Sequence, residues 1–313
     1  MANMKRGADD ADRREFKRGL GYAFGAFAFW GVVLPIYTKL LKEVPAFEIL
    51  AHRVLWGALA AGALLFATRG WTAARHSLTW RGVAALAVSA ALVTTNWTVY
   101  IIAVLSEHIV DASLGYFLNP LVSIALGMAF LGERLRPLQA LACAVAAVGV
   151  TVPILVSGGV PWIALTLAFS FGLYGLVRKV VRVDALVGFF VEVALLTPLA
   201  AAYVVVLAVR GEIVFSPSRP GLDLLLAGAG VVTAIPLILF SAGARRLPLT
   251  MLGLLQFTSP SMTLLLGVFL YGEPFTWVQG ATFGCIWTAC AITIADALLR
   301  RPQPLAARQA EAA

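Results

Sequence analysis

The 313-residue chain has little charge and very little cysteine. Only 13% of its residues are charged, whereas 60% are hydrophobic, and the mean hydropathy is +0.88. That composition supplies too few polar side chains to cover a water-soluble globule, so we expect the chain to lie in a lipid bilayer. The three cysteines fall in apolar runs, are odd in number and lack metal-ligand spacing, so we interpret them as small core residues.

The chain also lacks the short motifs that carry enzymatic chemistry. It contains no HExxH or GxSxG sequence and no array of Asp or His that resembles a protease or transferase site. We therefore expect neither an enzyme nor a bound cofactor or metal. The net charge of +8 does not favour nucleic-acid binding, because the basic residues form short clusters between apolar runs, as in proteins that orient in a membrane by charge.

Two segments 140 residues apart are similar, which indicates an internal duplication. Residues 114–139 read LGYFLNPLVSIALGMAFLGERLRPLQ, and residues 254–279 read LLQFTSPSMTLLLGVFLYGEPFTWVQ. The identical pairs are Phe117/Phe257, Pro120/Pro260, Leu126/Leu266, Gly127/Gly267, Gly132/Gly272, Glu133/Glu273 and Gln139/Gln279. If each copy crosses the membrane an odd number of times, the second copy must be inverted relative to the first, a construction that recurs in secondary transporters.

Ten apolar runs are long enough to cross a hydrocarbon core of roughly 30 Å, which takes about 20 helical residues. They lie near residues 19–40, 47–67, 82–105, 109–131, 138–156, 161–178, 184–208, 222–242, 249–271 and 276–299. The predicted fold is an all-α integral membrane protein with ten transmembrane helices in an inverted five-plus-five repeat. We place the repeats at residues 19–157 and 158–299, between a polar leader of residues 1–18 and a tail of residues 300–313.

Lys and Arg are distributed unequally over the connections between these runs. Nineteen lie in the leader, the even-numbered connections and the tail, four lie in the odd-numbered connections, and Arg53 lies within a span. Arg178, at the very end of the sixth run, is counted with the connection that follows it. Since cytoplasmic loops carry the excess of Lys and Arg, both termini are predicted to be cytoplasmic. With five spans in each copy, Glu133 then lies on the cytoplasmic side and its counterpart Glu273 lies outside.

Four blocks of the sequence carry a resemblance to a known family. They are WGVVLPIYTKLLKEVPAFEILAHRVLWG (30–57), ASLGYFLNPLVSIALGMAFLGERLRPLQ (112–139), FGLYGLVRK (171–179) and TAIPLILFSAGARRLPLTMLGLLQF (233–257). Together they resemble the RarD-like branch of the drug/metabolite transporter superfamily, whose EamA-type repeat has a Pro-containing span that closes on a Gly-Glu pair. The resemblance extends over about residues 19–299.

The resemblance implies a ten-helix carrier of a bacterial inner membrane, with a substrate path between two inverted halves. Members of the superfamily include exporters of amino acids, among them aromatic ones, and proteins linked to drug sensitivity. The identity of the solute varies within the superfamily and is not implied by the resemblance.

Prolines interrupt the fourth and ninth predicted spans at equivalent positions. Each proline removes a backbone donor and bends its helix, so Pro120 and Pro260 are predicted hinges. Substrate sites in repeat-based carriers lie near such interruptions at mid-membrane. We therefore predict that Asn119, Gln256 and Ser259 contact the solute, and an effect on helix packing alone is the alternative.

Other spans offer an amide and aromatic rings as further candidates for solute contact. Asn96 and Tyr100 are four residues apart in the third predicted span and share a helix face. A buried amide needs a partner, so the alternative for Asn96 is a hydrogen bond between helices. Trp30 in the first span and Tyr174 in the sixth complete the predicted substrate-binding residues.

Ionisable residues inside a span are expensive in hydrocarbon, so they indicate either function or mutual neutralisation. Glu48 and His52 lie one turn apart in the second predicted span, and Glu192 lies in the seventh. They are candidates for a proton relay, and pairing that locks the helix bundle is the alternative. No acid or base is predicted at the centre of the first, third, sixth, eighth or ninth span, which favours a neutral or zwitterionic, partly apolar solute.

Residues and resemblance together predict a secondary transporter that exports small neutral or zwitterionic metabolites, foremost amino acids including aromatic ones. A central cavity would be exposed alternately to the two sides of the membrane. A broad-specificity exporter of hydrophobic drugs and a proton-coupled metabolite antiporter are the alternatives. The expected partners are the solute and the lipid bilayer, without nucleic acid; a monomer would suffice for transport, and the oligomeric state is left open.

Overall fold

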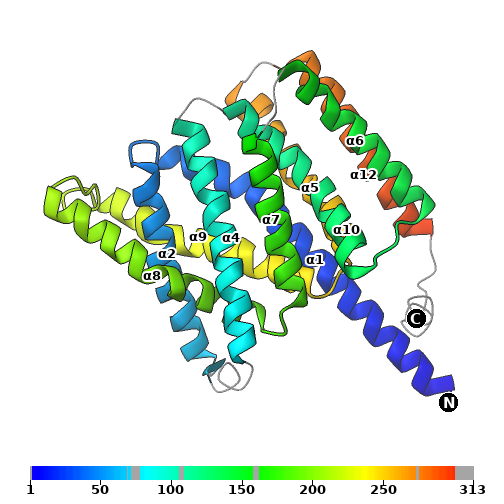
Figure 1. Cartoon of the computed structure of the whole chain (residues 1–313), viewed down its shortest axis with the longest axis horizontal. Coiled ribbons are helices and arrows are strands. Elements are labelled where there is room, and N and C mark those ends of the chain that lie inside the picture. Colours follow the sequence, from blue (N-terminus) through cyan, green and yellow to red (C-terminus); the bar gives the residue numbers. More distant parts are fainter. Residues whose placement is uncertain are drawn as a thin grey trace.

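The computed structural model describes residues 2–68, 70–71, 78–105, 109–157, 162–272 and 275–299, and the regular structure within these ranges is helical. The elements are α1 (Ala2–Leu40), α2 (Ala46–Ala67), α4 (Trp80–Leu105), α5 (Ile109–Leu131), α6 (Pro137–Ser157), α7 (Trp162–Val180), α8 (Ala185–Arg210), α9 (Pro220–Ala244), α10 (Leu249–Gln256), α11 (Thr258–Leu265), the π-helix η1 (Leu266–Leu270) and α12 (Trp277–Leu299). Figure 1 shows a helix bundle, with the amino-terminal part of α1 projecting beyond it.

Seven described helical segments are long and apolar enough to cross a membrane. They are Arg13–Leu40, Ala46–Ala67, Trp80–Ala103, Trp162–Val180, Ala185–Arg210, Pro220–Ala244 and Leu249–Leu270. Two shorter apolar helices lie at Gly115–Leu131 and Pro137–Val152. The expectation of an all-helical protein with several apolar helices is therefore confirmed.

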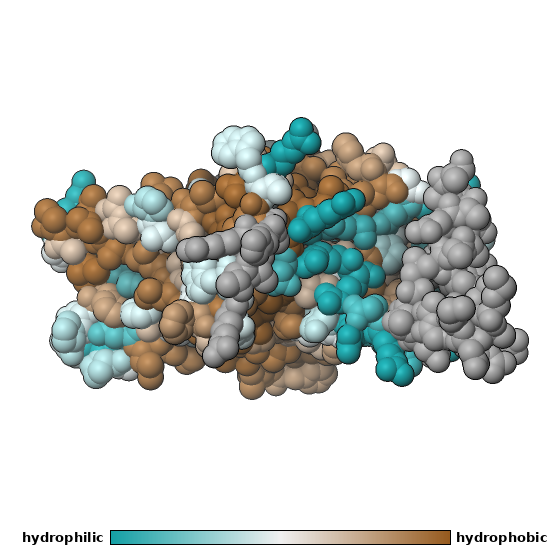
Figure 2. All heavy atoms as spheres, turned by 90° about the horizontal axis from the view of Figure 1, so that it is seen from below, coloured by the Kyte–Doolittle hydropathy of each residue, from teal (hydrophilic) through white to brown (hydrophobic). Residues whose placement is uncertain are grey.

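The surface of the bundle is apolar where lipid would surround it. Phe66, Val209 and Phe269 are 78%, 83% and 82% exposed, an arrangement that water would penalise and hydrocarbon would not. Figure 2 shows apolar side chains predominating on one face of the molecule, with hydrophilic ones gathered in one region of it. Several polar and charged side chains are instead buried between the helices, among them Glu48, Arg178 and Glu192.

The predicted polar leader is a continuation of the first helix, because α1 begins at Ala2 and runs without a break to Leu40. Most residues of this stretch, such as Ala, Lys, Arg and Glu, are good helix formers. Arg18 and Glu15 also form an ion pair at 2.7 Å, one turn apart on the helix surface. The leader therefore differs from the rest of α1 in polarity and not in secondary structure.

The two proline-containing spans differ in their continuity. The ninth predicted span divides into α10, α11 and η1, with Phe257 as a turn residue between α10 and α11. Pro260 explains the break, because its nitrogen cannot donate to the carbonyl of Gln256 and its ring crowds that carbonyl. α5 instead continues as a helix through Pro120.

The helices of the two halves pack in equivalent ways. α1 packs against α9 and α11, and α7, its counterpart in the second half, packs against α4 and α5. α2 also packs against α9, and the equivalent pair in the other half, α8 with α4, packs less extensively. Three further close pairs join counterparts to each other: α2 with α8, α5 with α10, and α6 with α12. Figure 1 shows α6 and α12 side by side at one edge of the bundle. Exchanging the two halves leaves this set of neighbours unchanged.

One end of the bundle, here called the Glu133 end, is tied together by that residue. Gly132 has a φ of 64°, a conformation that favours glycine, and turns the chain after α5. The Glu133 carboxylate then accepts hydrogen bonds from the N–H groups of Leu249 and Thr250 at 2.7 and 2.8 Å, capping α10. The ion pairs Glu15–Arg246, Asp184–Arg245 and Arg136–Asp296 lie at the same end.

The opposite end, here called the Glu48 end, contains the connections after α1 and α8. Glu48 accepts hydrogen bonds from the N–H groups of Val214 and Phe215 at 2.9 and 3.1 Å, which joins the start of α2 to the loop before α9. Gly272, the repeat counterpart of Gly132, has a φ of 67° and turns the chain in the same way. Glu273 lies outside the described residues.

Candidate substrate site

Arg53 lies inside the bundle, seven residues into α2 and therefore about 10 Å below the Glu48 end. Its Nε donates a hydrogen bond to Thr233 Oγ1 of α9 at 2.7 Å, and the Thr233 hydroxyl donates in turn to the Ala229 carbonyl at 2.8 Å. The guanidinium carbon lies 4.6 Å from the ring centre of Trp97 in α4. Contacts from two other helices thus fix the plane of the guanidinium group.

Three tyrosines lie in the neighbourhood of Arg53, namely Tyr37, Tyr100 and Tyr116. The rings of Tyr100 and Tyr116 meet edge to face with their centres 6.0 Å apart, and these residues are 37% and 43% exposed. Both residues therefore leave more than a third of their surface uncovered by the rest of the protein. Tyr37 donates a hydrogen bond to the carbonyl oxygen of Leu225 in α9.

A small cavity lies beside Arg53, between α1, α2 and α9, with room for about one water molecule. Its lining residues are Leu34, Tyr37, Thr38, Leu41, Ile49, Arg53, Ala229, Val232 and Thr233. An apolar wall with a few convergent polar groups is the usual composition of a small-molecule site. The cavity is too small for an amino acid, so a solute at Arg53 must occupy the side of Tyr100 and Tyr116 or separate the helices.

Five rings close the bundle between this site and the Glu133 end. They form the aromatic cluster, made of Phe27 and Trp30 of α1, Phe171 and Tyr174 of α7, and Phe240 of α9, with neighbouring ring centres 5.1–6.0 Å apart. Trp30 lies seven residues before Tyr37 on α1, so the cluster begins about 10 Å deeper than that tyrosine. Tyr174 is fully buried there, so neither it nor Phe240 faces open space in this conformation.

Asn96 joins two helices. Its side-chain nitrogen donates to the Leu167 carbonyl at 2.9 Å and to the Ser170 hydroxyl at 3.0 Å, both on α7. This is the interhelical hydrogen bond that the sequence left open as the alternative to solute contact. Tyr100, one turn further along α4, is the member of the pair that faces accessible space.

The residues beside the two prolines lie at close helix crossings. A Cβ atom on Gly253 of α10 would come within 2.7 Å of the Pro120 carbonyl oxygen, and one on Gly31 of α1 within 2.6 Å of the Ser259 carbonyl oxygen. Asn119 and Gln256 are buried, and their side-chain oxygens have no hydrogen-bond partner among the described residues. Such unsatisfied acceptors are available to water or to a solute donor if the crossing opens.

Glu48 and His52 are held by structural contacts. Besides its two backbone hydrogen bonds, Glu48 lies 3.9 Å from His52 Nε2. His52 Nδ1 accepts a hydrogen bond from Trp56 Nε1 at 3.2 Å, which places the proton of the neutral ring on Nε2, facing Glu48. The His52 ring stacks on Phe215 of the loop before α9. These contacts are those expected if Glu48 and His52 hold the helices together at the Glu48 end.

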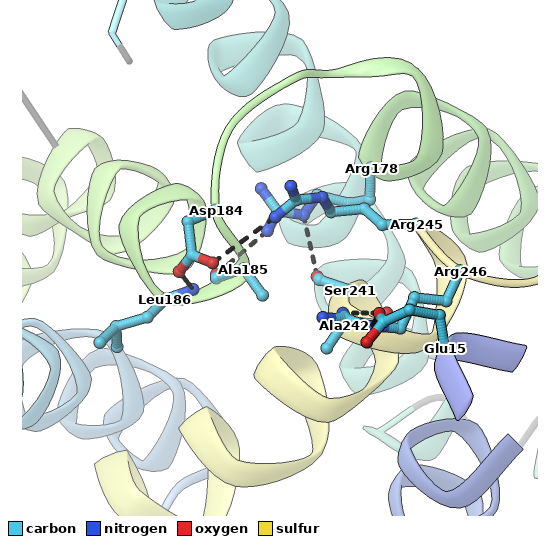
Figure 3. Close-up of polar contacts among 9 residues, drawn as sticks. All are labelled: Glu15, Arg178, Asp184, Ala185, Leu186, Ser241, Ala242, Arg245 and Arg246. Carbon is cyan, nitrogen blue, oxygen red and sulfur yellow. Dashed lines mark hydrogen bonds and ion pairs between the residues drawn. The ribbon is translucent and has the colours of Figure 1, made fainter. Parts of the chain in front are cut away.

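Glu192 is neutralised by Arg178. The carboxylate of Glu192 lies 3.4 Å from Arg178 Nη1 and accepts a hydrogen bond from the Ser89 hydroxyl at 2.6 Å. Figure 3 shows Arg178 reaching Ala185 and Ser241, to which it donates at 3.1 and 2.9 Å. The pair therefore ties α7 to α4, α8 and α9.

Sequence reasoning misplaced one residue and undervalued another. Arg178 was expected in the connection after the sixth span, but it lies inside α7 and is 1% exposed. The lone acid Glu192 in a neighbouring span was the signal for such a buried counter-charge. Arg53 was only counted as lying within a span, and the structure turns its side chain toward Thr233 of α9 and Trp97 of α4.

Comparison with known proteins gives close relatives over nearly the whole chain. The chain is 45% identical to Protein RarD of Salmonella typhi, covering 92% of this chain and 98% of the relative. It is 44% identical to an uncharacterized transporter of Vibrio cholerae, covering 92% and 95%. A chloramphenicol-sensitive protein RarD of Pseudomonas aeruginosa is 34% identical, covering 86% and 92%.

A crystal structure of a protein with 21% identity shares the fold, with a TM-score of 0.68 over 90% of this chain and 99% of that one. The EamA-like transporter family matches the chain twice, at residues 17–155 and 159–295. Two matches that together span most of the chain leave one assignment: this protein belongs to the EamA-like transporter family.

Proposed function

We propose that the protein exports small neutral or zwitterionic metabolites, foremost amino acids including aromatic ones, as a secondary transporter of a bacterial inner membrane. The observation that carries this proposal is the polar and aromatic site around Arg53, near which Tyr100 and Tyr116 are partly exposed, with the aromatic cluster closing the bundle toward the Glu133 end. In the proposed alternating-access cycle, this closure would open when the Glu48 end closes.

The proposed architecture is ten transmembrane helices in an inverted five-plus-five repeat, with repeats at residues 19–157 and 158–299. The exchange-symmetric packing of the two halves and the two matches to one family support it. Polar contacts also gather the predicted cytoplasmic connections at the Glu133 end and the predicted external ones at the Glu48 end. Both termini would then be cytoplasmic, and the closed aromatic cluster supports assigning this structure to an outward-facing state.

Export requires that the Glu133 end open while the Glu48 end closes. Separation of α1, α7 and α9 at the aromatic cluster would expose Trp30 and Tyr174 to the site, giving the predicted substrate contacts of these residues in the inward-facing state. The hydrogen bond that Pro260 cannot form weakens the helix at Phe257, whose backbone keeps right-handed helical dihedrals, so α10 and α11 can bend relative to each other there. Asn119, Gln256 and Ser259 lie at the crossings that such movement would loosen.

The contacts of the acidic residues support facilitated export over obligatory proton exchange. Glu48 is engaged by backbone N–H groups and Glu192 by Arg178 and Ser89, so both have structural partners. A proton-coupled carrier would carry a stoichiometric proton flux that Glu192→Gln or Glu48→Gln abolishes. We expect solute flux in liposomes without such a proton flux.

The test is exchange of radiolabelled L-phenylalanine by purified protein in liposomes, competed by unlabelled amino acids, lipophilic cations and chloramphenicol. We expect saturable uptake that other aromatic amino acids reduce and lipophilic cations do not. Chloramphenicol is included because one relative is named for sensitivity to it. Competition by lipophilic cations or chloramphenicol, without competition by amino acids, would favour the broad drug exporter.

A further inference from the structure

The charge of Arg53 has no counter-ion among the described side chains. Arg178, a second arginine buried in the bundle, lies 3.4 Å from the carboxylate of Glu192. Arg53 instead contacts a neutral hydroxyl and an aromatic face. A cation at this depth without a carboxylate is expensive, and the positions where proteins keep one are usually functional.

The orientation of the guanidinium group is also fixed in a way that suits a planar ligand. Thr233 occupies Nε, and the ring of Trp97 lies against the guanidinium, so the group is fixed on two sides by residues of α9 and α4. This leaves the edge with Nη1 and Nη2, whose parallel N–H groups match the two oxygens of a carboxylate. The described residues form no hydrogen bond at that edge.

The rings around Arg53 define the rest of the ligand. Tyr100 and Tyr116, which lie near Arg53, meet edge to face, and 37% and 43% of their surfaces are exposed. Aromatic rings favour an aromatic or apolar side group, and their hydroxyls can serve a polar one. A carboxylate with an apolar or aromatic group a few bonds away fits this combination.

We propose that Arg53 binds the carboxylate of the transported solute and that Trp97, Tyr100 and Tyr116 surround its apolar side group. This deepens the proposed export function and rests on it. Among the zwitterionic solutes of the proposed function, the carboxylate is then the group that is recognised: an amino acid binds, a simple organic acid that shares its carboxylate competes, and the corresponding amide or amine does not. The solute carboxylate also neutralises Arg53, a half-buried cation that has no counter-ion among the described side chains.

The experiment compares four competitors of L-phenylalanine exchange in proteoliposomes: L-phenylalanine itself, 3-phenylpropionate, L-phenylalaninamide and 2-phenylethylamine. We expect competition from the two carboxylates and at least about tenfold weaker competition from the amide and the amine, as for loss of a hydrogen-bonded charge pair. Equal competition by all four would overturn the proposal without touching the export function, and it requires no variant protein.

Substitutions of Arg53 test whether this residue binds the solute carboxylate. Arg53→Lys keeps the charge and loses the paired N–H groups, and Arg53→Gln loses both, so we expect the apparent affinity to fall about tenfold or more in each. The matched control is Arg210→Gln, which removes an exposed cation from the end of α8. Unchanged affinity in folded Arg53→Lys would overturn the proposal.

A second readout separates this inference from the proposed function. If the wild-type protein exchanges no amino acid, the export proposal fails, and the same four compounds are then tested for thermal stabilisation of the purified protein. Stabilisation by the two carboxylates alone, lost in Arg53→Lys, still supports a carboxylate site. Equal stabilisation by all four compounds, or none by the carboxylates, overturns it.

Discussion

At the residue scale, the buried ionisable groups of this protein are of two kinds. Glu48 and Glu192 have hydrogen-bond and ionic partners on neighbouring elements, and removing one partner leaves the other desolvated. Arg53 faces a hydroxyl and aromatic rings, so its charge is available to a ligand. Residues that hold helices together and residues that bind a ligand are therefore of the same types, and only their partners distinguish them.

A substitution of Gly188 on α8 tests how much the ion pair between Arg178 and Glu192 stabilises the protein. A Cβ atom at this position would lie 1.9 Å from Arg178 Nη1, so Gly188→Ala must displace the guanidinium from Glu192. Breaking a buried ion pair on one side typically costs about 3–5 kcal/mol. We expect Gly188→Ala to lower the free energy of unfolding by about 3 kcal/mol, measured as loss of the folded fraction in detergent on heating or denaturation.

The control for this substitution is Gly284→Ala in α12. A Cβ atom there meets nothing within 4 Å, so alanine should be neutral or stabilise the helix by up to about 1 kcal/mol. If Gly188→Ala and Gly284→Ala have the same free energy of unfolding, the Arg178 side chain does not pack against Gly188 of α8 in the way that the structure shows.

At the element scale, the break between α10 and α11 is the feature that a single substitution can repair. Pro260→Ala restores a donor for the Gln256 carbonyl and removes the ring that crowds it, so the two helices should join. We expect a several-fold lower maximal rate of L-phenylalanine exchange with little change in apparent affinity, because Arg53 is not touched. Initial rates over a range of solute concentrations measure both quantities.

Pro120→Ala is the matched control, because α5 already runs as a continuous helix through Pro120. It should lower the rate less than Pro260→Ala does. Equal effects of the two substitutions would mean that both prolines act through packing, the alternative that the sequence left open.

The helices could be predicted from the sequence more closely than the site. Runs of apolar residues bounded by charge, Pro or Gly gave the fourth span at 109–131, the range that α5 occupies, because hydropathy acts on every residue of a span. The partner of Arg53 or of Asn96 depends on which helices are neighbours, and one sequence holds no such information. Arg178 was misplaced for the same reason, since charge alone suggested a loop and Glu192 lies on another helix.

At the scale of the whole molecule, the proposed inverted repeat predicts that the Glu133 end and the Glu48 end of the bundle face opposite compartments. Arg134 lies exposed in the connection between α5 and α6, and Glu212 lies exposed after α8. In a protein whose three native cysteines are replaced, we expect Glu212→Cys to react with a membrane-impermeant maleimide in intact cells. Arg134→Cys should react only after the membrane is disrupted. Labelling of both positions from the same side would contradict the inverted topology.

The proposed role of Arg53 also predicts how the empty and the loaded carrier differ. When helices close around an empty site, Arg53 loses water without gaining a described counter-ion, whereas a bound carboxylate neutralises it before closure. Return of the empty carrier should therefore be the slow step. We expect unlabelled L-phenylalanine outside proteoliposomes to accelerate efflux of labelled L-phenylalanine several-fold over efflux into buffer.

Arg53→Gln should remove this acceleration, because the empty site then carries no charge to desolvate, and Arg210→Gln should preserve it. The measurement compares initial efflux rates with and without solute on the outer side, at equal protein density in the liposomes. Equal rates in the wild-type protein would mean that the empty carrier reorients as readily as the loaded one. In that case, the buried charge of Arg53 would not be what couples solute binding to closure.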